Sequence, residues 1–385
     1  MMRMNPFHRR GHSVFFVLFL CGLRVLYGEF DRLNAAQTQS DGWQRANLGY
    51  RFQFPRDHAN HPGYKLEWWY YTGNLSAADG RAFGYQVTFF RVGVEPAPIN
   101  PSRWAVRDLF MAHFAVTDIG GGRFRFAERL NRAAIGWAGT ENDRYRVWNE
   151  NWAASLDADS RHHLQADAPG MAVTLQLESG KPPVDEGING LSQKGTTEGN
   201  ASHYYSLTRM PTIGTLTLNG KAIPVRGLSW MDHEFGSSFL EEGQQGWNWL
   251  ALQLDDETEI MLYEFRRSDG ARDSHSGGSA IDRTGRRIPL RVGDFGMEVE
   301  RRWTSARSGA TYPIYWKVRI PAQGLDLRVR AVVPDQELVT TRSAGLTYWE
   351  GAVVVDGGRS GHAVGGRGYL EMTGYAGTGM SAVLR

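Results

Sequence analysis

The stretch FGYQVTFFR, residues 83–91, alternates large apolar side chains with smaller or polar ones from Phe83 to Phe89. Successive residues of a β-strand point to opposite faces, so this alternation predicts a strand with one face in a core. The stretch GWNWLALQL, residues 246–254, also places aromatic or aliphatic side chains on one face and polar ones on the other. Both stretches are typical of the wall of a β-barrel, and they indicate the fold class of the chain.

Short alternating stretches recur from Glu67 onward, separated by residue pairs that tolerate a positive φ. These pairs are Asp79-Gly80, Asn189-Gly190, Asn219-Gly220, Asp269-Gly270 and Asp356-Gly357. They predict hairpins as the repeating unit. No amphipathic pattern exceeds about three helical turns, and short helical pieces are expected only within 101–108 and 127–134. The chain is therefore predicted to be all-β and antiparallel, with few short helices.

The composition supports this fold class and argues against a nucleic-acid partner. The chain has 385 residues, more than one typical domain, so two β-domains are expected. Its 13 Trp, 15 Tyr, 18 Phe and 46 Gly suit strands joined by tight turns. Lys and Arg total 43 against 41 Asp and Glu. This balance creates no field that would collect nucleic acid or an anionic membrane surface.

The N-terminus predicts an exported protein. Basic residues, including Arg9 and Arg10, precede the apolar stretch Val14–Cys21, so residues 1–28 are expected to be a signal peptide. The apolar stretch is too short to span a bilayer comfortably. Membrane contact is thus expected only for ligand exchange or through an uncleaved signal segment, and the location is periplasmic or extracellular. Cys21 is the sole cysteine, so the mature chain would have no disulfide or thiol chemistry.

Two features predict how the mature chain is divided. The strand pattern pauses between Gly236 and Gly246, which indicates an N-terminal barrel over residues 45–240 and a C-terminal barrel over 241–378. The stretch 181–199, rich in Gly, Pro, Lys and Ser, is expected to be a long loop of the first half that folds over an opening.

Several motifs in one order resemble a known family. They are HPGYKLEWWYYTG at 61–73, FFR at 89–91, HFA at 113–115, SWMDHEFG at 229–236, GWNW at 246–249 and YWEGAV at 348–353. Together they resemble the AttH-like, carotenoid 1,2-hydratase-related lipocalin-like proteins over about residues 61–375. The resemblance implies two lipocalin-like (calycin) barrels with an apolar pocket between or within them. That group includes bacterial hydratases, predicted secreted hydrolases and related pericyclases.

The sharpest chemical cluster is Asp232-His233-Glu234. Three successive ionisable groups beside Trp230 can have their pKa values pulled apart by burial and mutual charge. In a straight strand Asp232 and Glu234 face one side and His233 the other, so all three meet only at a bend, which Gly236 offers. The alternative is a strand end whose carboxylates bind backbone amides and nearby arginines.

The resemblance assigns roles to this cluster. His233 matches a histidine of the hydratases' Asp-His motif, and Tyr263-Glu264 best matches their tyrosine with an acidic neighbour, with Glu in place of Asp. Those residues are implicated in protonating an isolated alkene and guiding water. The chemistry needs a neutral carboxylic acid and a base. Asp232 or Glu264 would be the acid and His233 the base, which makes Asp232, His233, Glu234, Tyr263 and Glu264 the candidate catalytic residues.

A second set of residues is expected to bind the ligand. It comprises Trp69, Tyr85, His113, Trp230, Trp247 and Trp249. Trp247 or Trp249 would offer the aromatic face that stabilises a carbocation. His113, inside an apolar stretch, is expected to be a hydrogen-bonded histidine of the core or of a pocket.

Three further carboxylates are expected to be structural. Glu67 stands before four aromatic residues, and we expect it to pair with an arginine such as Arg91, because buried carboxylates are normally paired. Glu350 and Glu371 resemble inward carboxylates of the second barrel, and we expect arginine partners for both.

Other chemistries lack their sequence signatures. No His-x-His or His-Glu-x-x-His spacing occurs among the 11 histidines, so neither a metal site nor another cofactor is predicted. No Gly-x-Ser-x-Gly elbow occurs, and Ser229 and Ser360 have no assured base. The leading hypothesis is a cofactor-independent exported lyase or isomerase acting on a small apolar ligand, such as an isoprenoid or polyene. A non-catalytic carrier of a hydrophobic ligand is the alternative, and a secreted hydrolase is the third.

Overall fold

Strands make up almost all of the regular structure in the computed structural model, which describes residues 42–97, 100, 102, 104–133, 135–237 and 240–377. Only two 3-10 helices accompany them in this part of the chain, η2 (Arg56–His58) and η3 (Pro321–Gln323). The prediction of an all-β fold with few short helices is confirmed. The predicted signal peptide and Cys21 lie outside the described residues.

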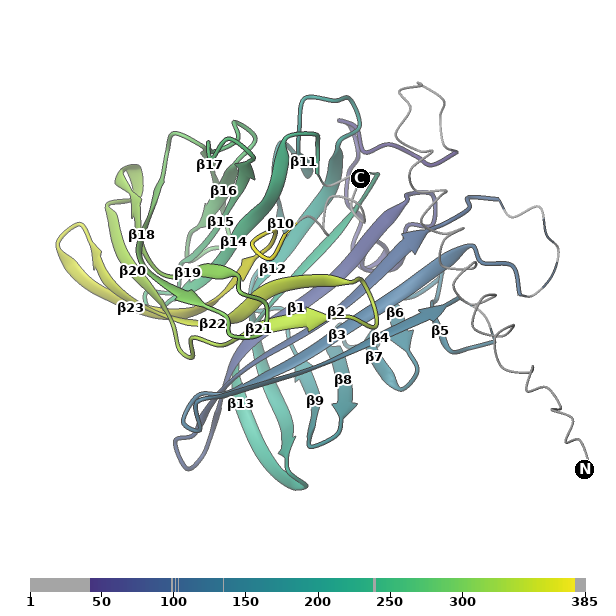
Figure 1. The fold of residues 1–385 in the computed structure, drawn as a ribbon, viewed down its shortest axis with the longest axis horizontal. Helices are drawn as coiled ribbons and strands as arrows, with labels where there is room; N and C mark the ends of the chain where they lie inside the picture. Colours follow the sequence, from purple (N-terminus) through teal and green to yellow (C-terminus); the bar gives the residue numbers. More distant parts are fainter. Residues whose placement is uncertain are drawn as a thin grey trace, which may run out of the picture. The chain divides into compact units, whose positions relative to one another are not determined.

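The first sheet contains thirteen antiparallel strands, drawn from purple to teal in Figure 1. They are β1 (Leu66–Ala77), β2 (Ala82–Gly93), β3 (Asp108–Asp118), β4 (Arg123–Arg132), β5 (Ala138–Thr140), β6 (Arg146–Asn149), β7 (Trp152–Leu156), β8 (His162–Ala168), β9 (Met171–Leu177), β10 (Val184–Asp185), β11 (Leu191–Gln193), β12 (Ala201–Leu218) and β13 (Lys221–Gly236). Their order is β4-β3-β2-β1-β13-β12-β9-β8-β7-β6-β5, with β10 and β11 paired to β12. The two ends of this sheet approach each other, because β4 contacts β5 and β6.

The second sheet contains ten antiparallel strands, drawn from green to yellow in Figure 1. They are β14 (Gln244–Leu254), β15 (Glu259–Arg267), β16 (Gly277–Ile281), β17 (Arg287–Arg291), β18 (Gly296–Thr304), β19 (Thr311–Ile320), β20 (Leu325–Ala331), β21 (Glu337–Thr340), β22 (Leu346–Arg359) and β23 (His362–Met372). Their order is β17-β16-β15-β14-β23-β22-β20-β19-β18, with β21 paired to β22. Two barrel-like sheets thus confirm the predicted pair of lipocalin-like barrels.

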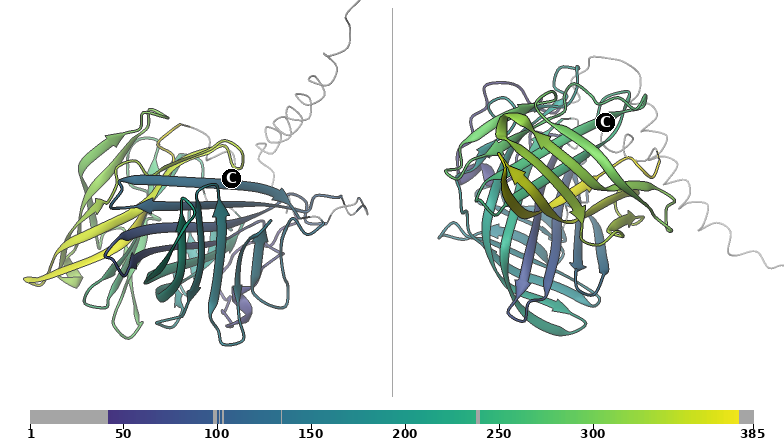
Figure 2. Two further views of the ribbon diagram at one scale, coloured as in Figure 1. Left: turned by 90° about the horizontal axis from the view of Figure 1, so that it is seen from below. Right: turned by 90° about the vertical axis from the view of Figure 1, so that its left-hand side faces the viewer.

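The two sheets pack on each other through their central strands. β2 contacts β22 and β1 contacts β23, and the views in Figure 2 place the green-to-yellow strands beside the long purple ones. Each sheet encloses its own apolar core, one containing Trp69 and Phe89 and the other containing Leu252 and Trp349. A third apolar cluster, which includes Trp230 and Trp249, lies where the sheets meet. The sheets therefore form one compact body that begins at Gly42.

Strand alternation decides which side chains reach this contact. In β2, Tyr85 and Val87 enter the first core, whereas Gln86 and Thr88 face the second sheet. In β14, both faces are buried, because Leu250 enters the second core while its neighbours face the first sheet. The polar face that the sequence assigned to this strand is therefore absent: Asn248 lies on the face of Leu250, Gln253 lies on the opposite face, and both are buried.

Two local expectations were wrong. Residues 127–132 are part of strand β4 rather than a short helix, because their backbone pairs with β3 along its whole length. Asp356-Gly357 is not a turn. Gly357 lies within β22, where a Cβ would come 2.2 Å from the carbonyl oxygen of Asp326, and the turn of this hairpin falls at Ser360-Gly361.

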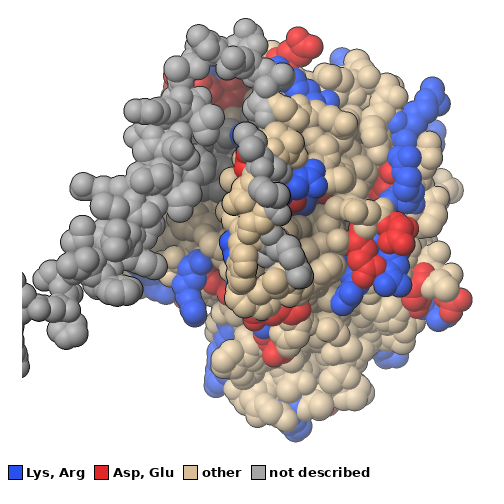
Figure 3. Space-filling model, turned by 90° about the vertical axis from the view of Figure 1, so that its right-hand side faces the viewer, with Lys and Arg blue, Asp and Glu red and all other residues tan. Residues whose placement is uncertain are grey.

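The charges on the surface agree with the balanced numbers of basic and acidic residues in the sequence. In the face shown in Figure 3, basic and acidic side chains lie next to one another among other residues. No helix in the described ranges is long and apolar enough to cross a membrane.

The first sheet ends at Gly236 and the second begins at Gln244, and the predicted domain boundary at 240/241 falls between them.

Candidate active site

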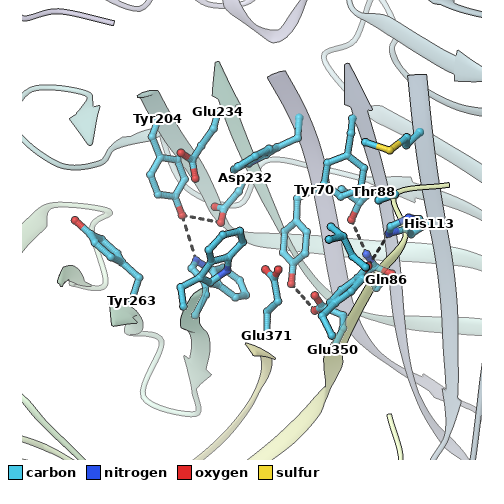
Figure 4. Close-up of a pocket in the computed structure, with 18 of the residues that line it drawn as sticks. Tyr70, Gln86, Thr88, His113, Tyr204, Asp232, Glu234, Tyr263, Glu350 and Glu371 are labelled. Carbon is cyan, nitrogen blue, oxygen red and sulfur yellow. Dashed lines mark hydrogen bonds between the residues drawn. The ribbon is translucent and has the colours of Figure 1, made fainter. Parts of the chain in front are cut away.

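A cavity lies between the two sheets and is lined mainly by aromatic side chains (Figure 4). The first sheet contributes Trp68, Tyr70, Gln86, Thr88, Phe90, Met111, His113, Tyr204, Asp232 and Glu234. The second sheet and the connecting segments contribute Lys194, Trp247, Trp249, Tyr263, Phe265, Ala344, Leu346, Tyr348, Glu350 and Glu371. Four carboxyl groups thus face an otherwise apolar space, and the chemistry of the site depends on their charge.

Asp232 lies on β13 between Tyr70 of β1 and Ser206 of β12. The hydroxyl of Ser206 and the indole Nε1 of Trp230 donate hydrogen bonds to Oδ1, at 2.6 and 2.7 Å. The hydroxyl of Tyr204 donates to Oδ2 at 2.6 Å. Burial outweighs these three donors and raises the pKa of Asp232 to about 7. The group is therefore poised to exchange a proton near neutral pH.

Glu350 and Glu371 form a pair of acids on neighbouring strands. They stand directly opposite each other in the β22–β23 ladder, an arrangement that is unfavourable when both are charged. Burial raises the pKa of Glu371 to about 8, and burial together with the charge of Glu371 raises the pKa of Glu350 well above its usual range. At neutral pH both groups are therefore held mainly as neutral carboxylic acids.

The arginine partners expected for these two acids were a wrong prediction. The hydrogen-bond partner of Glu350 is the hydroxyl of Tyr70, which donates to Oε1 at 2.6 Å. Oε2 of Glu350 is buried and makes no hydrogen bond to any described residue. Neither acid forms an ion pair with a described arginine, because aromatic side chains occupy the space around both. An uncompensated carboxyl in such surroundings keeps its proton instead.

Lys194 is the one lysine or arginine among the described lining residues. Its Nζ lies 2.8 Å from Oε2 of Glu234 and over the rings of Tyr204 and Tyr263. Its charge is therefore directed to Glu234. Lys194 belongs to the stretch 181–199, which was expected to be a long loop but contains the short strands β10 and β11, and Lys194 follows β11.

A loop of the second sheet is attached to the first sheet at the edge of the cavity. The backbone N–H groups of Arg342 and Ser343 donate to the carboxylate of Glu128 at 3.0 and 2.8 Å. The imidazole of His113 lies between Ser343 and Tyr348, with Nε2 2.9 Å from Oγ and Nδ1 2.7 Å from the phenol oxygen. Burial lowers the pKa of His113 to about 3, so it is a neutral hydrogen-bonding group of the cavity wall.

The structure separates the five candidate catalytic residues. Asp232, Glu234 and Tyr263 line the cavity, but His233 and Glu264 do not. β13 runs straight through this motif with a partner strand on each side, so His233 faces the core of the first sheet. Glu264 points away from the cavity, where it contacts Arg272 and accepts a hydrogen bond from Asn248 at 3.0 Å.

His233 belongs to a separate buried network. Its Nε2 lies 3.0 Å from Oε1 of Glu67, and its Nδ1 lies 3.0 Å from the hydroxyl of Tyr205. Oε2 of Glu67 accepts a hydrogen bond from Nε of Arg91 at 3.1 Å, which confirms the predicted pairing. Burial lowers the pKa of His233, so the imidazole is neutral.

The candidate ligand-binding residues are likewise divided between the cavity and the core of the first sheet. Trp247, Trp249 and His113 line the cavity. Trp230 lies behind this wall and reaches it through its hydrogen bond to Asp232. Trp69 and Tyr85 occupy the core of the first sheet, where Trp69 stacks on His233 and Tyr85 bonds Ser229 at 2.6 Å. They lie on the opposite face of their strands and do not reach the cavity.

Tyr70 and Tyr204 were missed by the sequence analysis. Each lies on a strand whose opposite face fills the core. Tyr70, for example, points into the cavity, whereas its neighbour Tyr71 points into the core. The signal was present in the stretch Trp68–Tyr71, where an aromatic residue at every position indicates a strand that is buried on both sides.

The raised pKa values predict how stability depends on pH. A carboxyl whose pKa is higher in the folded than in the unfolded chain stabilises the fold below its unfolded pKa of about 4. This contribution is lost as the pH rises through about 7 for Asp232 and about 8 for Glu371. We therefore expect the free energy of unfolding to fall between pH 5 and about 8, and Glu371→Gln to flatten this decline in urea titrations. A decline of unchanged size in the variant would contradict the raised pKa of Glu371.

Two closely packed antiparallel sheets with an aromatic cavity between them define a calycin-type protein. Comparison with protein families matches the AttH-like family over residues 45–375, so the chain belongs to that family.

Three solved structures have a similar fold. The crystal structure of a protein assigned as AttH from Nitrosomonas europaea is 32% identical, with a TM-score of 0.79 over 86% of this chain and 99% of that one. Kievitone hydratase from Nectria haematococca is 17% identical, with a TM-score of 0.65 over 87% and 96% of the two chains. CghA, in its structure with Sch210972, is 15% identical, with a TM-score of 0.50 over 81% and 89%. A search of curated proteins found no match.

Proposed function

We propose that this protein binds an apolar alkene between its two sheets and protonates it from a neutral carboxyl group, as a hydratase or an isomerase. The observation that carries the proposal is the Glu350–Glu371 pair, two adjacent acids in an aromatic cavity without a described cationic partner. Protonation of an isolated alkene requires such an acid, since water at neutral pH is too weak a donor. The kievitone hydratase fold is consistent with this reaction class.

The reaction uses two carboxyl groups from different sheets, Glu371 as the acid and Asp232 as the base. Glu371 gives its proton to one alkene carbon, and the π electrons form the new C–H bond. The positive charge left on the other carbon is stabilised by the faces of Trp247 and Trp249. Asp232, with its pKa about 7, takes a proton either from the water that adds or from a neighbouring carbon. In the first route the water oxygen bonds to the cationic carbon and the alkene is hydrated, and in the second the double bond moves. Asp232 then releases its proton to solvent and Glu371 takes one up, which restores both groups.

Glu350 and Tyr70 position the acid. The Tyr70 hydroxyl holds Oε1 of Glu350 at 2.6 Å, which fixes the carboxyl group opposite Glu371. When Glu371 has lost its proton, the remaining proton on Glu350 prevents two adjacent negative charges. The Glu350–Glu371 pair thus holds two protons before the transfer to the alkene and one proton after it.

A non-catalytic carrier is the second candidate, because the aromatic lining alone would shelter a hydrophobic ligand. The hydrolase alternative has less support. Ser229 is buried on the far side of β13, where its hydroxyl is hydrogen-bonded to Tyr85 and Thr212 at 2.6 and 2.7 Å. Export to the periplasm or the exterior is also part of the proposal, on the basis of residues 1–28, and cell fractionation of the full chain tests it.

Extraction of the natural ligand tests the proposed function. The protein is purified from its host, its bound lipid is identified by mass spectrometry, and the complex is then incubated in D2O. We expect a product with deuterium bound to carbon, which gains the mass of one water in a hydratase but not in an isomerase. Recovery of the ligand unchanged and free of carbon-bound deuterium would identify a carrier and exclude the enzyme.

A further inference from the structure

The signature motifs around His61 and His233 converge on a cluster that the proposed reaction does not use. His61 precedes β1, Glu67 lies on β1 and His233 on β13. Nδ1 of His61 and Nε2 of His233 lie 2.8 and 3.0 Å from the same oxygen, Oε1 of Glu67. One ligand atom from each residue falls within 4.8 Å of the other two. Two imidazole nitrogens thus converge on one carboxylate oxygen.

We propose that His61, Glu67 and His233 bind a divalent transition-metal ion, for which zinc is the best match. Two imidazoles and one carboxylate form a donor set that zinc takes in proteins, with water in a fourth position. Contacts of 2.8 to 3.0 Å between the donor atoms are slightly shorter than the separations expected around a tetrahedral ion with bonds of about 2 Å. The donor atoms must therefore separate slightly to admit the ion, and His61 is the one ligand of the three that lies outside the strands.

Each of the three ligands has an outer partner that fixes its orientation. Nε2 of His61 faces Oδ1 of Asp57 at 3.6 Å, and Oε2 of Glu67 is held by Arg91 at 3.1 Å. Nδ1 of His233 lies 3.0 Å from the Tyr205 hydroxyl. Such outer contacts are a regular feature of metal-binding histidines and carboxylates. They leave Nδ1 of His61 and Nε2 of His233 directed at Glu67.

The rings around the cluster hold the ligands in place. The His61 ring stacks on Phe235 with centroids 3.5 Å apart, and the His233 ring stacks on Trp69 at 5.0 Å. These contacts restrict both imidazoles to orientations that point their nitrogens at Glu67.

The charge around the cluster also suits a dication. Asp57, Glu67 and Asp108 are buried carboxylates, and Arg91 is the buried cation that contacts two of them. Arg56 contacts Asp57 from the solvent side. The three carboxylates and Arg91 together carry two negative charges, which one divalent ion balances once the imidazoles have given up their extra protons.

Metal binding requires a proton-free nitrogen on each imidazole. His61 then carries its proton on Nε2 toward Asp57, and the proton of His233 moves from Nε2 to Nδ1, where the Tyr205 oxygen accepts it. The Tyr205 hydroxyl then donates to Nδ1 of His58, 2.7 Å away. Any proton displaced from Nδ1 of His61 passes to solvent, so metal binding is expected to weaken at low pH.

Metal analysis of the tag-free, full-length protein tests the proposal. The protein is stripped with a chelator, titrated with zinc chloride and assayed for bound metal. We expect one equivalent of zinc, a rise of several degrees in Tm on zinc addition, and visible absorption bands when cobalt replaces zinc. His61→Asn is expected to lose all three, whereas His163→Asn, at an exposed histidine paired with Asp157, is expected to keep them.

The choice of variants separates loss of the metal site from a failure to fold. The side chain of His61 is 12% exposed and lies outside the strands, so His61→Asn tests the site even if His233→Asn fails to fold. Zinc bound equally by wild type and His61→Asn, or a wild-type Tm that zinc leaves unchanged, would overturn the proposal. The cluster would then be a closed hydrogen-bond network. Neither outcome depends on whether the cavity between the sheets is catalytic.

Discussion

Glu371→Gln is expected to lower turnover of the alkene ligand by about 10²- to 10⁴-fold, the range that a positioned general acid supplies. The amide has the shape of the acid but no proton to give to carbon. Ligand affinity is expected to stay within a few-fold, because the aromatic lining of the cavity is unchanged. Steady-state turnover and equilibrium binding of the natural ligand, measured side by side, separate the two effects.

Glu264→Gln is the informative comparison for this prediction. Glu264 belongs to the pair that resembles the hydratase motif, yet it contacts Arg272 outside the cavity. We expect this variant to keep its turnover. A large loss in Glu264→Gln together with full activity in Glu371→Gln would show that Glu264, and not Glu371, supplies the proton.

Arg91→Ala is expected to cost about 3–5 kcal/mol of folding free energy, because it leaves buried carboxylates without their cation. Both side chains of the Arg91–Glu67 pair are inaccessible to solvent. Arg91 also donates to the backbone oxygens of His61 and Tyr64 at 3.0 and 2.8 Å, so it ties the segment before β1 to the sheet. Urea unfolding measures the loss.

The exposed pair of Arg81 and Asp79 provides the matched control for Arg91→Ala. Both side chains are at least 41% exposed, and such pairs contribute about 0–1 kcal/mol. Arg81→Ala is therefore expected to leave the unfolding midpoint almost unchanged. Equal losses in the two variants would show that burial of the Arg91 network adds nothing to stability.

The fold could be predicted because its signals are local. Alternation in residues 83–91 places Tyr85 and Val87 in the core from sequence alone, and Asn219-Gly220 forms a hairpin turn with both φ values positive. Resemblance to the family supplied the number of barrels. The helical expectation for 127–132 failed because pairing with β3 overrides a weak local pattern.

The candidate site was only partly predictable, because it depends on contacts between distant residues. The motif Asp232-His233-Glu234 identifies the right strand, but no local signal shows that the strand continues straight and sends His233 to the other face. The partner of Glu350 is Tyr70, 280 residues away, so an arginine was the reasonable expectation. Glu67 and His233 are likewise 166 residues apart, beyond any metal-binding spacing motif.

The central claim is that the cavity holds neutral carboxylic acids near neutral pH, and infrared spectroscopy measures this directly without a ligand. The C=O stretch of a protonated carboxyl is distinct from the bands of carboxylates and amides. We predict a protonated-carboxyl band at neutral pH in the wild type that weakens in Glu371→Gln and in Glu350→Gln. The band should also decline as the pH rises past about 8. A wild-type spectrum at neutral pH with no more protonated carboxyl than these variants would contradict the account.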